Sequence, residues 1–296
     1  MEQRRLGRTD MHVSVLGFGG SEIGYDEAAP ATVARILGEA LDAGLNVVDT
    51  AECYLRSEQL IGGAVAGRRR ELYLFTKCGH PRGFGRGDWR PASLLKTIER
   101  SLERLRTDHV DLVQLHSCSE DELRRGDVIA ALQTARERGQ TRYIGYSGDG
   151  GAARYAVECG AFDTLQTSVS IADQEALTLT LPLARERNMG VIAKRPIANA
   201  AWTSTRKPPR NAYHYEYWDR LRTLDYDFLR GEAAATALRF TLAVPGVHTA
   251  IVGTSRPGRW QENAAAVARG VLPADRYEAI RARWAEVADA SWVGQV

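Results

Sequence analysis

DLVQLH, residues 111–116, is a short apolar run that ends in a polar side chain, and two earlier runs do the same, NVVDT at 46–50 and LYLFTK at 72–77. Longer helical patterns separate the three runs, which is typical of parallel strands joined by helices. In a closed parallel barrel the carboxyl ends of the strands meet at one rim, where such enzymes place their reacting groups. We therefore expect the polar side chains that close these runs to come together.

Eight runs of this kind occur in the chain, and the other five are VSVLGF at 13–18, YIGYS at 143–147, TLQTSV at 164–169, VIAKRP at 191–196 and TAIVG at 249–253. Eight strands close an α/β barrel of the (β/α)8, or TIM, type, which needs about 250 residues. The chain length therefore predicts a single barrel domain over residues 1–296. A polar turn within residues 4–17, RRLGRTDMHVSVLG, predicts an N-terminal β-hairpin that closes the bottom of the barrel.

The segment 199–230 has no strand pattern and is rich in aromatic and basic side chains. It lies between the seventh run and the helix expected after it, and long loops in such places are usually functional or disordered. We expect this segment to fold over a ligand, and a mobile solvated insertion is the alternative.

Charge and composition argue against several classes of partner. The 39 Lys and Arg nearly balance the 37 Asp and Glu, so the overall charge favours neither nucleic acid nor an anionic membrane surface. No stretch approaches the roughly 18 apolar residues of a membrane span, and the first residues lack the apolar core of a signal peptide. The four cysteines follow no CxxC spacing. We expect a cytoplasmic protein without disulfides, and the sequence specifies no oligomeric state.

Four side chains close to the strand ends suit the reduction of a carbonyl group: Asp49, Tyr54, Lys77 and His116. Reduction by a nicotinamide needs a hydride at carbon and a proton at oxygen, where negative charge develops. A tyrosine hydroxyl, with a pKa near 10, can supply that proton if a neighbouring cation favours its ionised form. Lys77 is expected to be this cation, held by Asp49, while His116 orients the substrate oxygen.

These side chains stand in motifs that resemble the aldo-keto reductase family. The matching segments are LGFGG at 16–20, DTAECY at 49–54 with SEQLIGGAV at 57–65, FTK at 75–77, VDLVQLH at 110–116, RYIGYSG at 142–148, LQ at 165–166, VPGVHTAIVGTS at 244–255 and RWQEN at 259–263. The resemblance covers nearly the whole chain. It implies that Tyr54 donates the proton, that Lys77 and Asp49 tune it, and that His116 orients the carbonyl.

No GxGxxG follows the first strand, so a nicotinamide cofactor would be held differently from the Rossmann manner. The resemblance implies an extended dinucleotide across the barrel mouth. Residues with donors or charge for it are Gly20, Gly253, Thr254, Ser255, Arg256 and Arg259. Two arginines suit a 2′-phosphate, which favours NADP(H) over NAD(H). By family position, Glu262 and Asn263 would contact adenine, and Ser147 and Gln166 the carboxamide.

The sequence departs from the family pattern around the nicotinamide and the pyrophosphate. Gly148 stands where an Asn usually follows the serine, and Val169 where a Tyr often packs on the ring. Beyond the seventh strand, Ala198 and Ala200 replace glycines that let the backbone approach the pyrophosphate. Lys194 and Arg195 are expected to compensate with charge, and a purely structural role for them is the alternative.

On the substrate side, Leu55 replaces a glycine and is expected to narrow the pocket. Phe84 or Trp89 would close over a substrate from the loop after Lys77, and ordinary packing of either ring is the alternative. Cys118, like Cys53 and Cys78, lies within a few residues of the four central side chains. A zinc site there is disfavoured because a metal would compete with the lysine ammonium, so no metal is expected and an oxidisable thiol at the mouth is the better interpretation.

The sequence thus predicts an NADP(H)-dependent reductase of aldehydes or ketones. Three alternatives remain: a sugar or alcohol dehydrogenase that uses the same residues in the oxidative direction, a barrel that binds cofactor with negligible turnover, and a metallohydrolase built on Asp49, His116 and the cysteines. The sequence does not specify the substrate or the stereochemistry.

Overall fold

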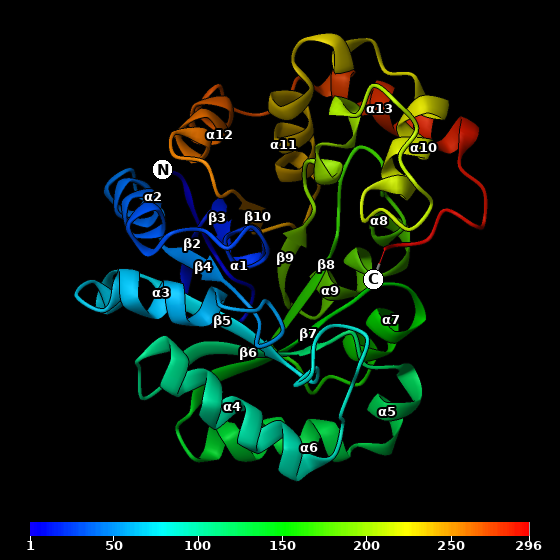
Figure 1. Ribbon diagram of the computed structural model, residues 1–296. Coiled ribbons are helices and arrows are strands. Elements are labelled where there is room, and N and C mark those ends of the chain that lie inside the picture. The colour runs from blue at the N-terminus through cyan, green and yellow to red at the C-terminus, as the bar shows by residue number, and fades with distance from the viewer. Residues whose placement is uncertain (296) are drawn as a thin grey trace.

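The computed structural model describes residues 1–295, and its centre is a closed barrel of eight parallel strands (Figure 1). The strands follow the chain order around the barrel, and the last pairs with the first. Their bounds are β3 Leu16–Gly19, β4 Val47–Asp49, β5 Tyr73–Cys78, β6 Val110–His116, β7 Thr141–Ser147, β8 Thr164–Ser168, β9 Gly190–Lys194 and β10 Thr249–Gly253. The predicted (β/α)8 fold is confirmed.

Helices cover the outside of the barrel. They are α1 Ser21–Tyr25, α2 Pro30–Asp42, α3 Ser57–Val65, α4 Pro91–Leu105, α5 Glu120–Arg125, α6 Asp127–Glu137, α7 Gly150–Glu158, α8 Ala176–Leu179, α9 Leu181–Glu186, α11 Ala233–Ala243, α12 Arg259–Ala268 and α13 Ala274–Val287, with a 3-10 turn η1 at Arg69–Glu71. Proline at the first position starts α2 and α4, because its missing N–H has no partner there in any helix. None of the helices within residues 1–295 is long and apolar enough to cross a bilayer.

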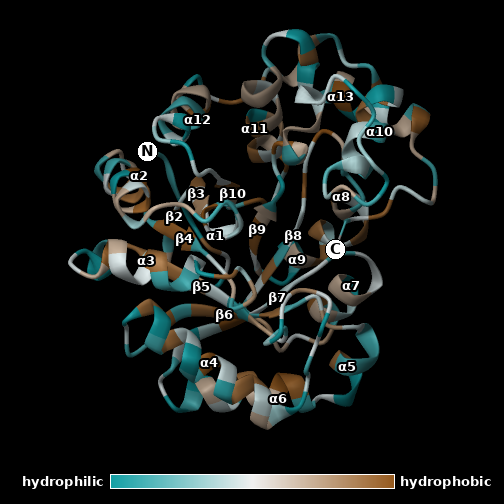
Figure 2. Cartoon of the chain, viewed as in Figure 1, coloured by the Kyte–Doolittle hydropathy of each residue, from teal (hydrophilic) through white to brown (hydrophobic). Residues whose placement is uncertain are grey.

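The main core lies between the barrel and the helices. Figure 2 shows apolar strands at the centre and helices whose outer faces are polar. Helix α4 is an example, since Leu94, Ile98, Leu102 and Leu105 recur on the one face that is buried. The strands are buried on both faces, as expected of a parallel sheet covered by helices.

A β-hairpin precedes the barrel, as predicted. Strand β1, Gln3–Arg5, pairs antiparallel with β2, His12–Ser14. Leu6, Met11 and Val13 from the hairpin pack against Phe75 and Leu112 inside the barrel, in a second apolar cluster. The hairpin therefore closes the barrel at the amino ends of its strands.

The first predicted strand, 13–18, is divided in the structure. Its beginning belongs to β2 and its end to β3, with Val15 between them. The apolar run is continuous because both halves are buried, one in the hairpin and one in the barrel, so hydrophobicity alone does not mark the boundary.

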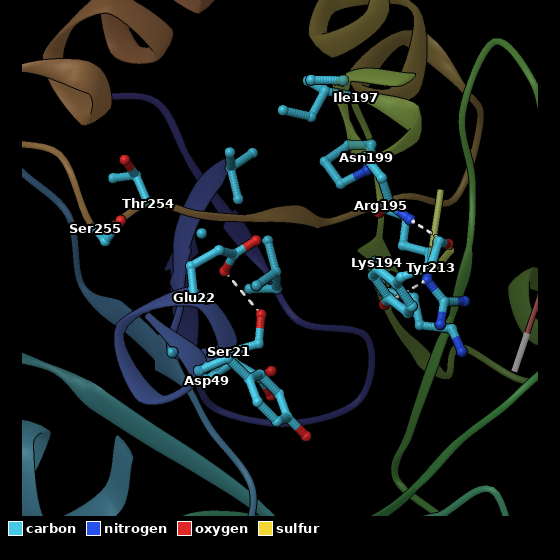
Figure 3. Close-up of a pocket in the computed structure, with 18 of the residues that line it drawn as sticks. Ser21, Glu22, Asp49, Lys194, Arg195, Ile197, Asn199, Tyr213, Thr254 and Ser255 are labelled. Atoms are coloured by element: carbon cyan, nitrogen blue, oxygen red, sulfur yellow. Dashed lines mark hydrogen bonds between the residues drawn. The ribbon is translucent and has the colours of Figure 1, made fainter. Parts of the chain in front are cut away.

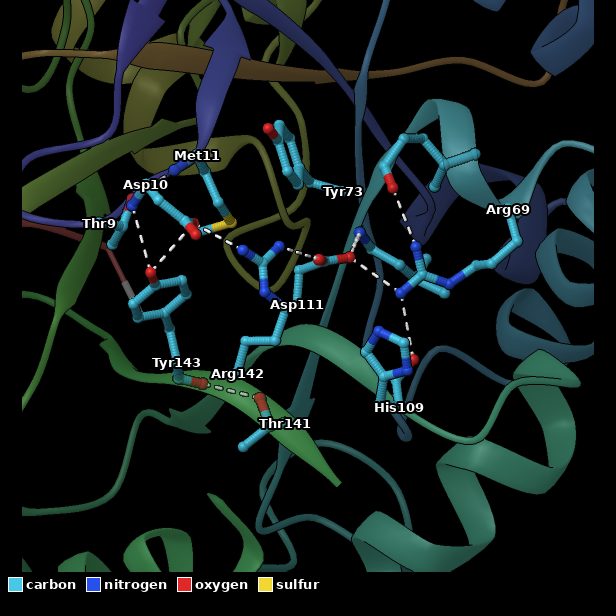
Figure 4. A network of polar contacts seen from close by, with 12 residues as sticks. Thr9, Asp10, Met11, Arg69, Tyr73, His109, Asp111, Thr141, Arg142 and Tyr143 are labelled. Atoms are coloured by element: carbon cyan, nitrogen blue, oxygen red, sulfur yellow. Dashed lines mark hydrogen bonds and ion pairs between the residues drawn. The ribbon is translucent and has the colours of Figure 1, made fainter. Parts of the chain in front are cut away.

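A network of hydrogen bonds and ion pairs lies at the amino ends of the strands and joins them to the hairpin (Figure 4). The buried Asp111 carboxylate, near the start of β6, accepts bonds from Arg69 Nη2 at 2.9 Å, Arg142 Nη1 at 2.7 Å and the Leu74 N–H at 2.9 Å. Arg142 also pairs with Asp10 in the hairpin turn at 2.6 Å. This network lies at the amino ends of the strands, where residues in this fold serve stability.

The segment 199–230 is partly helical, which the sequence did not predict. It forms the 3-10 turn η2 Ala198–Thr203, helix α10 Tyr215–Leu224 and the 3-10 turn η3 Asp227–Arg230. Tyr217, Leu221 and Leu224 lie four and three residues apart and are buried, so α10 has an apolar face that the many aromatic and basic residues around it obscure.

Candidate active site

A cavity of about 840 Å³ opens at the carboxyl ends of the strands (Figure 3). Most of the predicted site residues line it, from several different strands and loops: Gly20, Asp49, Tyr54, Phe84, His116, Ser147, Gln166, Lys194, Arg195, Gly253, Thr254, Ser255, Arg256, Arg259 and Asn263. The segment around Asn199, Trp202, Tyr213 and His214 also lines the cavity, in keeping with the expectation that it folds over a ligand.

An ion pair lies at the floor of this cavity. The Lys77 ammonium and the Asp49 carboxylate are 2% and 4% exposed, and Nζ lies 2.5 Å from Oδ2. Nζ also donates to the Thr50 carbonyl oxygen at 2.9 Å and lies 5.2 Å from the centre of the Tyr54 ring. Burial raises the pKa of Asp49, and the ammonium opposes this effect. Adjacent strands β4 and β5 thus bring Lys77 beside Asp49 and Tyr54, which lie 28 and 23 residues earlier in the sequence.

The phenol of Tyr54 differs from its predicted state. Burial raises the pKa of Tyr54 well above its usual value, and the Asp49 carboxylate adds to the rise while Arg195 opposes it. The predicted lowering of this pKa is not found, because burial has the largest effect and raises it, while Lys77 directs its N–H groups at Asp49 and Thr50. The Tyr54 side chain is half-buried and opens on the cavity, so at neutral pH it presents a protonated hydroxyl there.

His116 ends β6 beside Tyr54, with the two ring centres 5.7 Å apart in an edge-on arrangement. Burial, then the Lys77 charge, lowers the pKa of His116 well below its usual value, so the imidazole is neutral at pH 7. Its Nδ1 lies 3.5 Å from the Cys53 sulfur. The Phe84 ring centre lies 5.1 Å from that of His116 and faces the same cavity.

Two buried amide groups in the cavity wall have unused donors. Ser147 Oγ donates to Gln166 Oε1 at 2.8 Å, and this leaves Gln166 Nε2 buried without a hydrogen bond among residues 1–295. Asn263 Nδ2, at the other end of the cavity, is buried and unpaired in the same described part of the chain. Buried polar groups are normally satisfied, so these donors favour a ligand with acceptors at both ends. A dinucleotide with a carboxamide at one end and a purine at the other fits them.

Acidic side chains hold two residues at the predicted adenosine end. Ser255 Oγ donates to Asp26 Oδ2 at 2.6 Å, and Arg259 Nη1 pairs with Glu262 Oε2 at 2.6 Å. Glu262 does not line the cavity and its side chain is 62% exposed. The Glu262 carboxylate turns back one helical turn to Arg259 instead of facing the cavity, and its adenine contact stays a prediction.

The turn after β9 has a backbone conformation that favours glycine. Arg195, Ala198, Asn199 and Ala200 have φ values of 56°, 45°, 53° and 50°, in the left-handed region that favours glycine. The alanines thus adopt a backbone conformation that favours glycine, at a cost in strain. Lys194 and Arg195 both line the cavity, as their predicted role requires.

Three of the four expected substrate-pocket residues lie outside the cavity. Leu55 is 54% exposed with a φ of 47°, so the glycine it replaces is needed for the backbone and not for room in the pocket. Trp89 packs edge-on against His80, with ring centres 5.3 Å apart. Cys118 is buried, and its carbonyl oxygen accepts a bond from the Tyr146 hydroxyl at 2.8 Å. Phe84 alone keeps its predicted position.

The two departures near the nicotinamide position have structural reasons. A Cβ on Gly148 would lie 2.6 Å from the Tyr146 hydroxyl, so this tyrosine requires glycine there. Val169 is fully buried in the core outside the barrel and does not line the cavity. Val169 therefore does not occupy the ring-packing place that the sequence assigned to it.

Sequence reasoning missed Asp149 and Glu22. Asp149 Oδ2 pairs with Lys194 at 2.7 Å, and its Oδ1 accepts bonds from Thr167 and from the Ser168 N–H. Lys194 and these bonds outweigh burial and lower the pKa of Asp149, while burial lowers the pKa of Lys194 to about 8. Both residues lie just beyond a strand end, Asp149 two residues after β7 and Glu22 three after β3, which is the signal that was available.

Comparisons with known proteins identify the family of this chain. The family model described as Aldo/keto reductase family matches residues 15–285. The chain belongs to the aldo-keto reductase family. A solved aldo-keto reductase, AKR11C1 from Bacillus halodurans in its holo form, is 29% identical with a TM-score of 0.82, over 96% of each chain.

Two curated relatives match over most of their length. "Uncharacterized oxidoreductase YqkF" of Bacillus subtilis is 28% identical, over 89% of this chain and 90% of the relative. "L-galactose dehydrogenase" of Arabidopsis thaliana is 29% identical, over 90% of this chain and 88% of the relative. As an aldo-keto reductase, this chain is an oxidoreductase whose cofactor is a nicotinamide dinucleotide.

Proposed function

We propose that this aldo-keto reductase reduces an aldehyde or ketone with NADPH and that Tyr54 donates the proton to the carbonyl oxygen. The observation that carries the proposal is the arrangement at the cavity floor. A protonated tyrosine and a neutral histidine face one space above a buried lysine–aspartate pair, and the same cavity continues to two unpaired amide donors.

The bound cofactor would supply a hydride to the carbonyl carbon. The chain's own residues do the rest. The Tyr54 hydroxyl keeps its proton until negative charge builds up on the carbonyl oxygen, and then gives it up. The Lys77 ammonium, held by Asp49, stabilises the phenolate that remains. His116 is neutral and engages Cys53 through Nδ1, so its Nε2 is the atom left to orient the carbonyl oxygen.

A second candidate is the reverse reaction, the oxidation of an alcohol or sugar. The name of the Arabidopsis relative, L-galactose dehydrogenase, favours it, and the same four residues would serve. A cofactor-binding barrel with negligible turnover is disfavoured, since Asp49, Tyr54, Lys77 and His116 are all present and grouped.

The function is tested by a panel of aldehydes, ketones and sugars, followed through the absorbance of NADPH, with the matching alcohols and NADP⁺ run in parallel. Carbonyl-dependent loss of NADPH supports the proposal. Activity with the alcohols alone would move the assignment to a dehydrogenase, and no turnover with either set would overturn the proposed function.

The preference for NADP(H) rests on Arg256 and Arg259, which line the adenosine end. Exposed helical ion pairs are worth only about 0.3–0.5 kcal/mol, so a phosphate can draw Arg259 away from Glu262. We expect Arg259→Ala to weaken NADPH binding by about tenfold or more and NADH binding little. Arg269→Ala, on the far end of α12, is the matched control. Fluorescence titration with both cofactors measures this, and equal losses for NADPH and NADH would refute the 2′-phosphate assignment.

The alternative cofactor is NAD(H), and one contact favours it. Asp26 holds Ser255 at the adenosine end, and carboxylates are the usual partners of a free ribose diol. The same titration decides between the two, because tighter binding of NADH than of NADPH by the unmodified protein would select NAD(H).

A further inference from the structure

Glu22 is a carboxylate in the middle of the cavity, and the proposed mechanism does not use it. It lies in the short helix α1, directly after β3, between the Thr254–Ser255 loop and Asp49 (Figure 3). A Cβ on Gly253 would lie 1.6 Å from Glu22 Oε2, so the carboxylate rests directly against the backbone where β10 ends. The side chain is exposed toward the cavity, and protein encloses it on its other sides.

This carboxylate has no cationic partner among residues 1–295. Its one side-chain hydrogen bond comes from Ser21 Oγ, which donates to Oε2 at 2.7 Å. Burial raises the pKa of Glu22, the Ser21 bond opposes this, and the nearby Asp26 carboxylate raises it further. Glu22 faces the cavity with protein on its other sides, with a second carboxylate nearby and with no cation beside it. More negative charge next to it therefore favours its protonated form.

The position of Glu22 matters because of what lies on either side. The nicotinamide end of the cavity, with Ser147 and Gln166, is beyond Asp49, and the adenosine end begins at Thr254. An extended dinucleotide that reaches both ends has its diphosphate in the middle. The diphosphate therefore passes the Glu22 carboxylate, which lies between the two ends and close to Gly253.

Other charged and titratable groups around this place are few. Asp26 and Tyr25 lie on or beside α1, and Asp49 and Tyr54 lie toward the nicotinamide end. Lys194, which pairs with Asp149, and Arg195 line the same cavity from the end of β9 and make no ion pair with Glu22. Arg256 and Arg259 line the adenosine end. The two arginines make no ion pair with Glu22, and Arg259 is engaged by Glu262. Nothing in the described chain therefore neutralises Glu22 when a diphosphate arrives.

We propose that Glu22 opposes the cofactor diphosphate unless it is protonated, so that dinucleotide binding takes up a proton at Glu22 and weakens as the pH rises. The inference rests on the proposed function, since it requires a nicotinamide dinucleotide in this cavity. Wherever Glu22 is ionised in the free protein and protonated in the complex, the affinity falls by up to about tenfold per pH unit. Glu22 thereby acts as a pH-dependent determinant of cofactor affinity.

The test compares Glu22→Gln with the wild-type protein, using NADPH and NADH as probes. Gln keeps the shape and the Ser21 bond but removes the charge. We expect the variant to bind both cofactors at least about tenfold more tightly at pH 8 and to lose most of the pH dependence. Calorimetry in two buffers of different ionisation enthalpy should show proton uptake by the wild type and none by the variant.

Glu137→Gln, on the exposed side of α6, is the matched control and should behave like the wild type. If Glu22→Gln perturbs the fold, as judged by circular dichroism, Glu22→Ala repeats the test. Weaker binding by either variant would overturn the inference, because it would mean that the carboxylate accepts a bond from a ribose hydroxyl. Binding without proton uptake would also overturn it while leaving the proposed function intact. No binding to any of the proteins would reject both.

Discussion

Tyr54→Phe should lower turnover of a carbonyl substrate by about 10³-fold while NADPH binding stays within about twofold of the wild type. The substitution removes only the hydroxyl. The ring remains edge-on to His116 and above the Lys77 ammonium, so the cavity keeps its shape. The loss reflects the proton that must reach the oxygen as charge develops there. Steady-state rates and cofactor fluorescence measure the two quantities.

Tyr143→Phe provides the control for Tyr54→Phe. The Tyr143 hydroxyl bonds Asp10 in the hairpin turn, at the opposite end of the barrel, so its removal should leave turnover unchanged. Turnover by Tyr54→Phe close to that of the wild type would show that another group donates the proton. A matching loss of NADPH affinity would show instead that the hydroxyl acts in binding.

Lys77→Met should lower both stability and activity. The substitution leaves the Asp49 carboxylate buried at 4% exposure without its cation, and breaking a buried pair in this way costs about 3–5 kcal/mol in the free energy of unfolding. Turnover should fall by at least about 10²-fold, because no cation remains to stabilise the phenolate. Denaturant unfolding and steady-state kinetics report the two effects.

The double variant Lys77→Met with Asp49→Asn separates stability from catalysis. Removing both charges relieves the unpaired carboxylate, so most of the lost stability should return. Activity should not return, since the ammonium is still missing. Recovery of both would mean that Lys77 contributes only to folding, and recovery of neither would mean that the pair is not the source of the stability loss.

The strand ends explain why the sequence located so much of this site. Asp49, Lys77 and His116 each close an apolar run, and the topology of a parallel barrel then requires them to meet at one rim. Residues whose position depends on a strand end were therefore placed correctly. The same reasoning would have included Asp149 and Glu22, which follow β7 and β3.

The positions of the other predicted site residues depend on the paths of loops and on the directions of side chains. The Leu55 side chain turns away from the cavity because its backbone is in the left-handed region, and the Glu262 side chain turns back to Arg259. No local sequence pattern specifies either direction. The pKa of Tyr54 was predicted to fall, but that prediction considered one cation and omitted burial, which outweighs it. Helix α10 was not predicted because the few residues of its apolar face lie in a segment that is mostly polar.

We expect the cavity to hold a reduced nicotinamide beside an acid that can complete carbonyl reduction. Stopped-flow mixing of the NADPH-bound protein with a reactive aldehyde such as 4-nitrobenzaldehyde tests it most directly. The expected result is an aldehyde-dependent loss of NADPH absorbance in a single turnover, and a loss that is slower by orders of magnitude in Tyr54→Phe. NADPH that binds but is not oxidised at any aldehyde concentration would contradict it.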